Sequence, residues 1–204
     1  MNTRSLVVIS AGLSQPSSTR LLADQISAAA VGAAERQNIA LTVHVIELRD
    51  LAHDIANNLL TGFPPAVLKE AIDAVEAADA LIAVTPIFAA SYSGLFKSFI
   101  DVIDKDALAD KPVIIAATAG TARHSLALEH ALRPLFVYLR AVVIPTAVFA
   151  ATDDWGADSA EGTLRSRIDR ASGELARELE RRDPVSVVDP FALNVNFEDL
   201  LKSL

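Results

Sequence analysis

The chain contains no cysteine, few basic residues and no long apolar run. The absence of cysteine excludes disulfides, thiolate chemistry and metal sites built on cysteine. No apolar stretch reaches the roughly 20 residues that a membrane-spanning helix needs. The first residues, 1–4, lead directly into an apolar strand and show no signal-peptide pattern. We therefore expect a cytoplasmic protein without a membrane segment.

The charge balance is acidic, with 18 Lys and Arg against 26 Asp and Glu and a formal net charge of −8. Proteins that bind nucleic acid usually carry a basic stripe, and none is visible here, so we expect no nucleic-acid partner. The four histidines show no metal-ligand spacing, so no metal site is predicted. An acidic chain that binds a phosphate must do so locally, through backbone N–H groups and hydroxyls.

Apolar runs typical of strands alternate with helix-period runs along the chain. Residues 5–10, 80–84 and 112–117 are apolar without alternation, which indicates strands covered on both faces. Residues 41–46 alternate apolar and polar side chains, and residues 141–149 contain a proline, so both segments favour sheet edges. We therefore predict a flavodoxin-like α/β fold, a five-stranded parallel sheet of order 2-1-3-4-5 with helices on both faces.

Helices are predicted over roughly residues 20–36, 64–76, 94–104, 125–139 and 159–181. The helix over 94–104 carries apolar residues around much of its circumference, which is more than one sheet face can cover. This pattern indicates a helix–helix contact between subunits of a homodimer or homotetramer. One domain is expected over residues 1–183. The tail, residues 184–204, is expected to pack on its own chain or on a neighbouring subunit.

In this strand order the ligand crevice lies between the first and third strands, where the winding direction reverses. The first loop at that point, residues 10–20, places hydroxyls and a glycine before a helix start, where unpaired N–H groups bind phosphate. It lacks the Gly-Lys-Ser/Thr ending of a P-loop and the G-x-G-x-x-G turn. The alternative is an ordinary N-cap in a Ser-rich turn. The residues predicted to bind phosphate are Ser10, Gly12, Ser14, Ser17, Ser18 and Thr19.

The second and third loops follow the two apolar strands that come next. After the strand over 80–84, Pro86, Ile87 and Phe88 offer backbone and apolar surface to a flat ring, or belong to the core at a strand end. Residues 91–93 either join this site or cap the next helix. The third loop offers the small residues and hydroxyls of 118–121. His124 is either an acid or base or a hydrogen-bonding residue at a helix start, and Trp155 is either a lid or a loop anchor.

Together these loops resemble the NADPH-dependent FMN reductase family of flavodoxin-like proteins, including reductases that supply reduced flavin to alkanesulfonate monooxygenases. The resemblance covers about the first 150 residues. Phe88 stands where the family usually has Tyr. Ala11-Gly12 and Ser14 stand where its phosphate loop commonly has a Gly-Ser and an Arg. The segments that carry the resemblance are Ser10–Arg20, Thr85–Phe88, Ser91–Gly94 with Lys97, and Thr118–Thr121 with His124.

The resemblance implies FMN and NADPH or NADH as cofactors, with hydride transfer from nicotinamide to flavin N5 and no catalytic side chain. It implies further partners, namely free flavin, nicotinamide and a flavin-dependent monooxygenase. Tyr92 matches a position at which some sulfonate-linked reductases carry a helix-insertion residue at a tetramer contact. Tyr92 and His124 are candidate active-site residues. The residues that would cradle the isoalloxazine are Pro86, Ile87, Phe88, Ser91, Thr118, Ala119, Gly120 and Thr121.

Two other functions remain open from the sequence. A flavodoxin-like quinone or azo reductase would retain FMN and reduce a bound aromatic compound, and a flavin-binding protein without catalysis would bind FMN only. The residues also leave the choice between NADPH and NADH open. Arg20 and Arg123 are candidates for contact with the 2′-phosphate that distinguishes NADPH.

Overall fold

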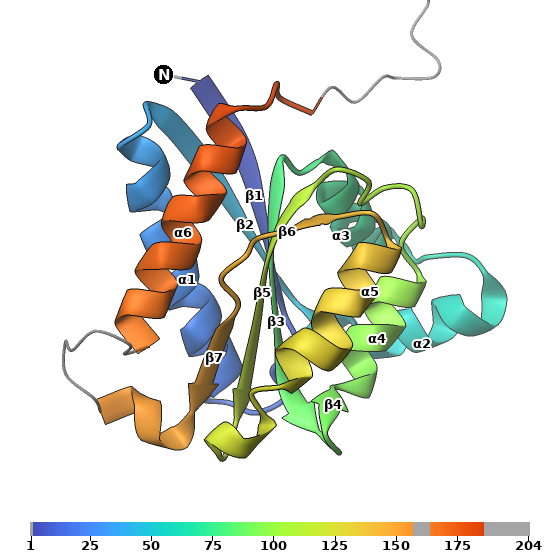
Figure 1. The fold of residues 1–204 in the computed structure, drawn as a ribbon. Coiled ribbons are helices and arrows are strands. Elements are labelled where there is room, and N and C mark those ends of the chain that lie inside the picture. Colours follow the sequence, from blue (N-terminus) through green and yellow to red (C-terminus); the bar gives the residue numbers. More distant parts are fainter. Residues whose placement is uncertain (1, 157–163, 186–204) are drawn as a thin grey trace, which may run out of the picture.

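A computed structural model describes residues 2–156 and 164–185 of the chain (Figure 1). The start of the helix predicted from residue 159 and most of the predicted tail lie outside these residues. The strands are β1 (Asn2–Ser10), β2 (Ile39–Glu47), β3 (Ala80–Phe88), β4 (Ser91–Tyr92), β5 (Pro112–Ala119), β6 (Val142–Val143) and β7 (Val148–Ala151). The helices are α1 (Ser18–Glu35), α2 (Ala52–Thr61), α3 (Ala66–Ala77), α4 (Gly94–Asp101), α5 (Arg133–Tyr138) and α6 (Leu164–Glu180).

The sheet confirms the flavodoxin-like class and corrects the number of strands. Its hydrogen-bonded order is β2-β1-β3-β5-β6, and the neighbours on this path are parallel. Counted along the predicted strands, this is the order 2-1-3-4-5. The sheet has seven strands rather than five, because β4 pairs antiparallel with β3 and the predicted fifth strand is divided into β6 and β7.

Helices cover both faces of the sheet (Figure 1). Helices α1 and α6 lie on one face, where they pack on the side chains of Leu6, Val8 and Ile82. Helices α3, α4 and α5 lie on the other face, around Val7, Ile9 and their neighbours. The predicted edge strand β2 has half-exposed alternating residues, whereas β3 is buried along almost its whole length. No helix within the described ranges is long and apolar enough to cross a bilayer.

Proline divides the predicted fifth strand. The N–H of Ile144 still donates to Val113 O at 2.9 Å, but Pro145 has no N–H with which to continue the ladder. The N–H of Thr146 turns to Glu174 on α6 instead, at 2.8 Å from Oε2. The chain then rejoins the sheet as β7, again beside β5. This second pairing carries the loop after β7 to the carboxyl end of the sheet.

Proline also alters the helix predicted over 125–139. The structure has a π turn, Leu128–Leu132, followed by the short helix α5 with Pro134 near its start. In a continuous α-helix Pro134 would have to donate a backbone N–H to the carbonyl of His130, and proline has none. A π turn accommodates this break without ending the helical direction.

Two further segments differ from the sequence-based expectations. Helix α2, which ends at Gly62 with φ +78°, was not predicted, although a left-handed glycine after an apolar-periodic run is a helix-end signal. Helix α4 ends at Asp101 rather than near residue 104. Its side chains Phe96 and Phe99 are fully buried within the chain's own core. The surplus apolar surface that predicted a subunit contact through this helix is therefore not present on these side chains.

Candidate functional site

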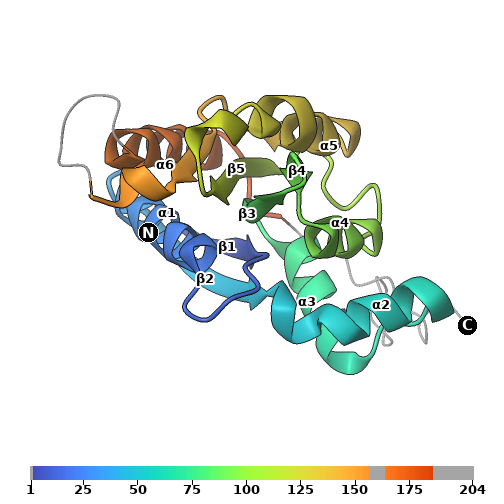
Figure 2. The same cartoon turned by 90° about the horizontal axis from the view of Figure 1, so that it is seen from below.

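A cavity of about 530 Å³ opens at the carboxyl ends of β1, β3 and β5, where the strand order reverses. Figure 2 faces this end of the sheet, at which β3 turns into β4. A ligand crevice is expected at this point of an open α/β sheet. The cavity is lined by Leu13, Ser14, Ser18, Thr19, Pro86, Ile87, Phe88, Thr118, Ala119, Gly120, Thr152 and Trp155.

The first loop folds tightly against the start of α1. Ser17 is the N-cap of α1, and its hydroxyl accepts a hydrogen bond from the N–H of Arg20 at 3.2 Å. Gly12 lies so close to this cap that a Cβ on it would stand 2.0 Å from Ser17 Oγ. The loop therefore requires glycine at position 12, and it directs Ser14, Ser18 and Thr19 toward the cavity.

Buried hydroxyls connect the loops around the cavity. Thr19 Oγ1 and Thr118 Oγ1 are 2.8 Å apart and join the start of α1 to the end of β5. Thr85 Oγ1 accepts a hydrogen bond from the N–H of Ser93 at 3.0 Å and donates one to the carbonyl of Pro86. These bonds are shielded from water, so they fix the loops relative to each other.

A tight hairpin carries the apolar platform of the second loop. Ala89 and Ala90 join β3 to β4 with φ values of +47° and +67°, a left-handed conformation that alanine adopts only at a cost of about 1–2 kcal/mol per residue. The turn leaves the ring of Phe88 half exposed at the cavity, at 49%. Such strain is characteristic of functional sites.

The structure brings together most, but not all, of the predicted site residues. Ser10 is fully buried at the end of β1, and its hydroxyl has no hydrogen-bond partner within the described part of the chain. Thr121 caps a short 3₁₀ turn, Ala122–His124, through its hydroxyl. Gly12 packs closely against Ser17, the N-cap of α1, and both residues shape the first loop. These four residues do not line the cavity, nor do Ser91, Tyr92 and His124.

Tyr92 occupies a different setting from the one that the resemblance implies. It lies in strand β4, half buried, with its ring centroid 5.9 Å from that of Phe96. The helical insertion that the structure describes is the π turn at Leu128–Leu132. Tyr92 is therefore not part of a helix insertion.

Leu13, Thr152 and Trp155 line the cavity as well, and the sequence singled out only Trp155 among them. The turn that holds Thr152 and Trp155, Thr152–Gly156, follows β7. Asp154 anchors this turn, because its carboxylate accepts the N–H of Ala151 at 2.8 Å and pairs with Arg167 on α6 at 3.1 Å. Trp155 also packs against the core beneath α6, so the residue predicted to be a lid or a loop anchor contacts both the cavity and the core.

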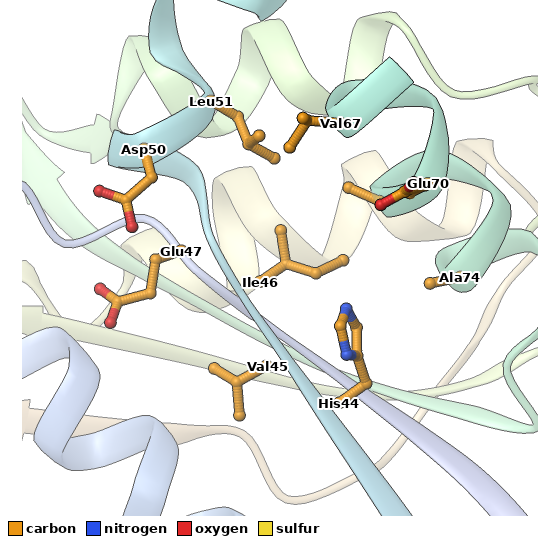
Figure 3. Close-up of a pocket in the computed structure, with 10 residues that line it drawn as sticks. His44, Val45, Ile46, Glu47, Asp50, Leu51, Val67, Glu70 and Ala74 are labelled. Atoms are coloured by element: carbon orange, nitrogen blue, oxygen red, sulfur yellow. The ribbon is translucent and has the colours of Figure 1, made fainter. Parts of the chain in front are cut away.

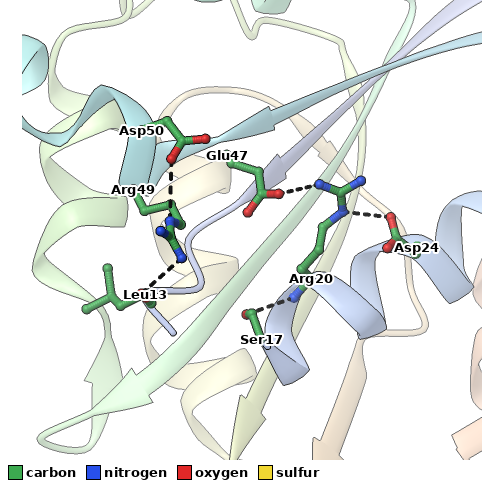
Figure 4. A network of polar contacts seen from close by, with 7 residues as sticks. All are labelled: Leu13, Ser17, Arg20, Asp24, Glu47, Arg49 and Asp50. Atoms are coloured by element: carbon green, nitrogen blue, oxygen red, sulfur yellow. Dashed lines mark hydrogen bonds and ion pairs between the residues drawn. The ribbon is translucent and has the colours of Figure 1, made fainter. Parts of the chain in front are cut away.

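Among residues 2–156 and 164–185, no charged side chain lines the cavity. Arg20, which the sequence offered as a phosphate contact, is paired with Asp24 at 2.8 Å and with Glu47 (Figure 4). The hydrogen bond to Asp24 is the main reason that the pKa of Arg20 lies above its ordinary value. Arg49 pairs with Asp50 and contacts the carbonyl of Leu13 at 3.5 Å. Any anion in the cavity would therefore depend on hydroxyls and N–H groups.

Another cavity of about 340 Å³ lies between β2 and α3 (Figure 3). His44 and Ile46 on β2 face Ala74 on α3 across it. Three carboxylates surround it, those of Glu47, Asp50 and Glu70. No Lys or Arg among the described residues lines it, and Glu70 adds a negative charge, so this cavity does not suit a phosphorylated cofactor.

Comparison with known proteins agrees with this geometry. A family described as NADPH-dependent FMN reductase matches residues 4–156. An FMN reductase (NADPH) of Pseudomonas aeruginosa is 40% identical over 150 residues, which are 74% of this chain and 78% of that protein. The NADH-dependent FMN reductase SfnE of Pseudomonas putida is 37% identical over 166 residues, 80% of this chain and 87% of that protein.

Solved structures agree as well. An oxidoreductase from Corynebacterium diphtheriae is 50% identical, with a TM-score of 0.86, and the match covers 90% of this chain and 100% of that one. The apo form of the NADH:FMN oxidoreductase EMOB is 31% identical, with a TM-score of 0.75 over 85% of this chain and 89% of that one. The fold, the cavity at the reversal of strand order and these matches show that the chain belongs to the family of NADPH-dependent FMN reductases.

Proposed function

We propose that this NAD(P)H-dependent FMN reductase binds FMN in the 530 Å³ cavity and releases the reduced flavin to an acceptor. The observation that supports this proposal is the lining of the cavity, which combines hydroxyls at a helix start with an apolar platform and, within the described residues, contains no charged group. Its volume lies within the roughly 300–1,000 Å³ typical of cofactor pockets. The tight Gly12 turn supports the fit, since it leaves the N-terminus of α1 open to a phosphate.

Each part of the lining has a separate task in this proposal. Ser14, Ser18 and the N-terminus of α1 bind the phosphate, while Pro86 to Phe88 and Thr118 to Gly120 orient the ring system. Bound FMN supplies the capacity to accept a hydride from nicotinamide. Trp155 excludes water from one side of the cavity. No side chain has to act as acid or base, so the residues contribute by orientation.

The neutral phosphate site favours a flavin that exchanges. A Lys or Arg side chain would add Coulombic attraction to a phosphate, so a lining that holds neither among the described residues binds phosphate more weakly. Weak binding suits a protein that passes reduced FMN to a flavin-dependent monooxygenase rather than keeping it. We propose that the enzyme acts in the cytoplasm, as a homodimer or homotetramer.

Fluorescence of the chain's single tryptophan, Trp155, tests the location of the site. Titration with FMN should quench this emission, because Trp155 lines the cavity. Ser18→Ala should weaken FMN binding about tenfold and leave riboflavin binding nearly unchanged, since riboflavin lacks the phosphate. Ser98→Ala, on α4 and outside the cavity, serves as the control. Unquenched emission, or equal effects on both flavins, would contradict the proposed site.

Turnover tests the reaction itself. NADPH or NADH oxidation should depend on added FMN, and a quinone should not replace FMN as the acceptor. Oxidation that proceeds without added flavin, with FMN retained through gel filtration, would instead favour a quinone or azo reductase.

A further inference from the structure

A further cavity of about 440 Å³, named the second cavity below, is lined by residues of two loops that also line the proposed flavin site. The same two loops border both cavities. Phe88 lines the first and Ser91 the second, on either side of the strained Ala89–Ala90 turn. In the third loop, Gly120 lines the first cavity and Arg123 the second. A ligand extending from the flavin ring over this turn would therefore enter the second cavity.

The second cavity has a basic lining in an acidic protein. Arg123, His124 and His130 contribute a guanidinium and two imidazoles, and Ser91 adds a hydroxyl. Within the part of the chain that the structure describes, no carboxylate belongs to the lining, although the chain has a net charge of −8. This concentration of donors indicates a site for an anion.

Arg123 is available to such an anion. Its side chain is exposed, and within residues 2–156 and 164–185 no carboxylate pairs with it. The acidic neighbour of His130 is Glu129, and both of its carboxylate oxygens accept hydrogen bonds from Arg133, at 2.6 and 2.9 Å. The hydrogen bonding from Arg133 also lowers the pKa of Glu129. Glu129 is thus already neutralised and does not compete for Arg123.

We propose that this second cavity binds the 2′-phosphate of NADPH and gives the enzyme a preference for NADPH over NADH. The inference rests on the proposed function, because the nicotinamide must reach the flavin in the neighbouring cavity. A phosphomonoester is the group that NADPH has and NADH lacks, and a guanidinium binds phosphate through paired hydrogen bonds. Arg20, the other candidate, is held by Asp24 and Glu47 (Figure 4). Arg123 is therefore the specificity-determining residue, assisted by His124 and His130.

Steady-state kinetics with both nucleotides test the preference. Arg123→Gln should lower kcat/KM for NADPH about ten- to a hundredfold through KM, and should change the value for NADH less than about twofold. Arg123→Lys should restore part of the loss. Arg170→Gln, an exposed arginine on α6, removes the same charge elsewhere and should leave both values unchanged.

Calorimetry with adenosine fragments provides a readout independent of turnover. Adenosine 2′,5′-bisphosphate should bind at least about tenfold more tightly than adenosine 5′-monophosphate, and Arg123→Gln should abolish the difference. Equal binding of the two fragments, or an equal loss with NADPH and NADH, would overturn the inference while the reductase function stands. Failure to oxidise either nucleotide in the presence of FMN would instead overturn the proposed function.

Discussion

At the scale of single residues, the shape of the first loop, residues 10–20, depends on the absence of a side chain at Gly12. The ideal Cβ position of Gly12 is 2.0 Å from Ser17 Oγ and 3.1 Å from Thr19 Cβ. Ser17 caps α1, and Thr19 is bonded to Thr118, so neither side chain can move without losing a buried contact. Gly12 contributes to the site by permitting close approach, not by binding.

We therefore expect Gly12→Ala to weaken FMN binding at least about tenfold and to destabilise the chain by about 1–3 kcal/mol, the usual cost of overpacking. Trp155 quenching measures the first effect and urea unfolding the second. Gly94→Ala is the matched control, because a Cβ on Gly94 meets nothing within 4 Å. Normal FMN binding by the Gly12→Ala variant would show that the loop relaxes freely.

Strand periodicity explains why Ser10 does not line the cavity. Ser10 shares a face of β1 with Leu6 and Val8, because side chains alternate along a strand. Its side chain therefore points toward the layer of α1 and α6 rather than into the cavity. Ser14 and Ser18 lie beyond the strand, where the loop turns them to the open end of the sheet. Composition alone could not separate these positions.

At the scale of elements, the strands and their order could be predicted because their apolar pattern reflects their burial. The structure differs from the predicted elements where a proline removes a backbone N–H donor. Pro145 divides the last strand, and Pro134 follows the π turn. Both prolines are visible in the sequence, but where the chain rejoins the sheet depends on Glu174 of α6. Since β7 returns to β5, its following turn reaches the cavity, which is why Thr152 was missed.

Lys111 connects two elements and makes the stability dependent on pH. It precedes β5 and is 5% exposed, and its Nζ donates to the carbonyls of Val75 and Glu76 at the end of α3, both at 2.8 Å. Burial lowers the pKa of Lys111 from 10.5 to about 8, against the weaker influence of Asp79 and Glu76. As the pH rises, the folded state therefore loses the Lys111 proton at a lower pH than the unfolded state does.

The free energy of unfolding should therefore gain a contribution from Lys111 as pH rises from about 8 toward 10.5, because the unfolded chain then binds more protons. The gain is at most about 3.5 kcal/mol, since one pKa unit corresponds to about 1.4 kcal/mol. Urea unfolding at several pH values measures it. Lys111→Met should remove the rise, and Lys105→Met, an exposed neighbour, should keep it. If the free energy of unfolding rises equally with pH in both variants, groups other than Lys111 cause the rise.

At the scale of the whole molecule, charge and site chemistry are consistent with each other. A net charge of −8 repels flavin phosphate at long range, and no cationic side chain of the described residues lines the cavity to oppose this field. Arg20 and Arg49 lie close to the first loop, but both are paired with carboxylates. Attraction is therefore restricted to the hydroxyls and N–H groups at the start of α1, which act over short distances.

The dependence of flavin association on salt follows from this arrangement. Raising the ionic strength from about 0.01 to 0.15 M shortens the Debye length from about 30 to 8 Å and screens the repulsion between FMN and the chain. The association rate constant for FMN should then rise about two- to threefold, whereas that for uncharged riboflavin should stay constant. Stopped-flow quenching of Trp155 measures both. A rate constant for FMN that falls with salt, beside an unchanged one for riboflavin, would mean that Arg49 and the N-terminus of α1 outweigh the acidic field at the mouth of the cavity.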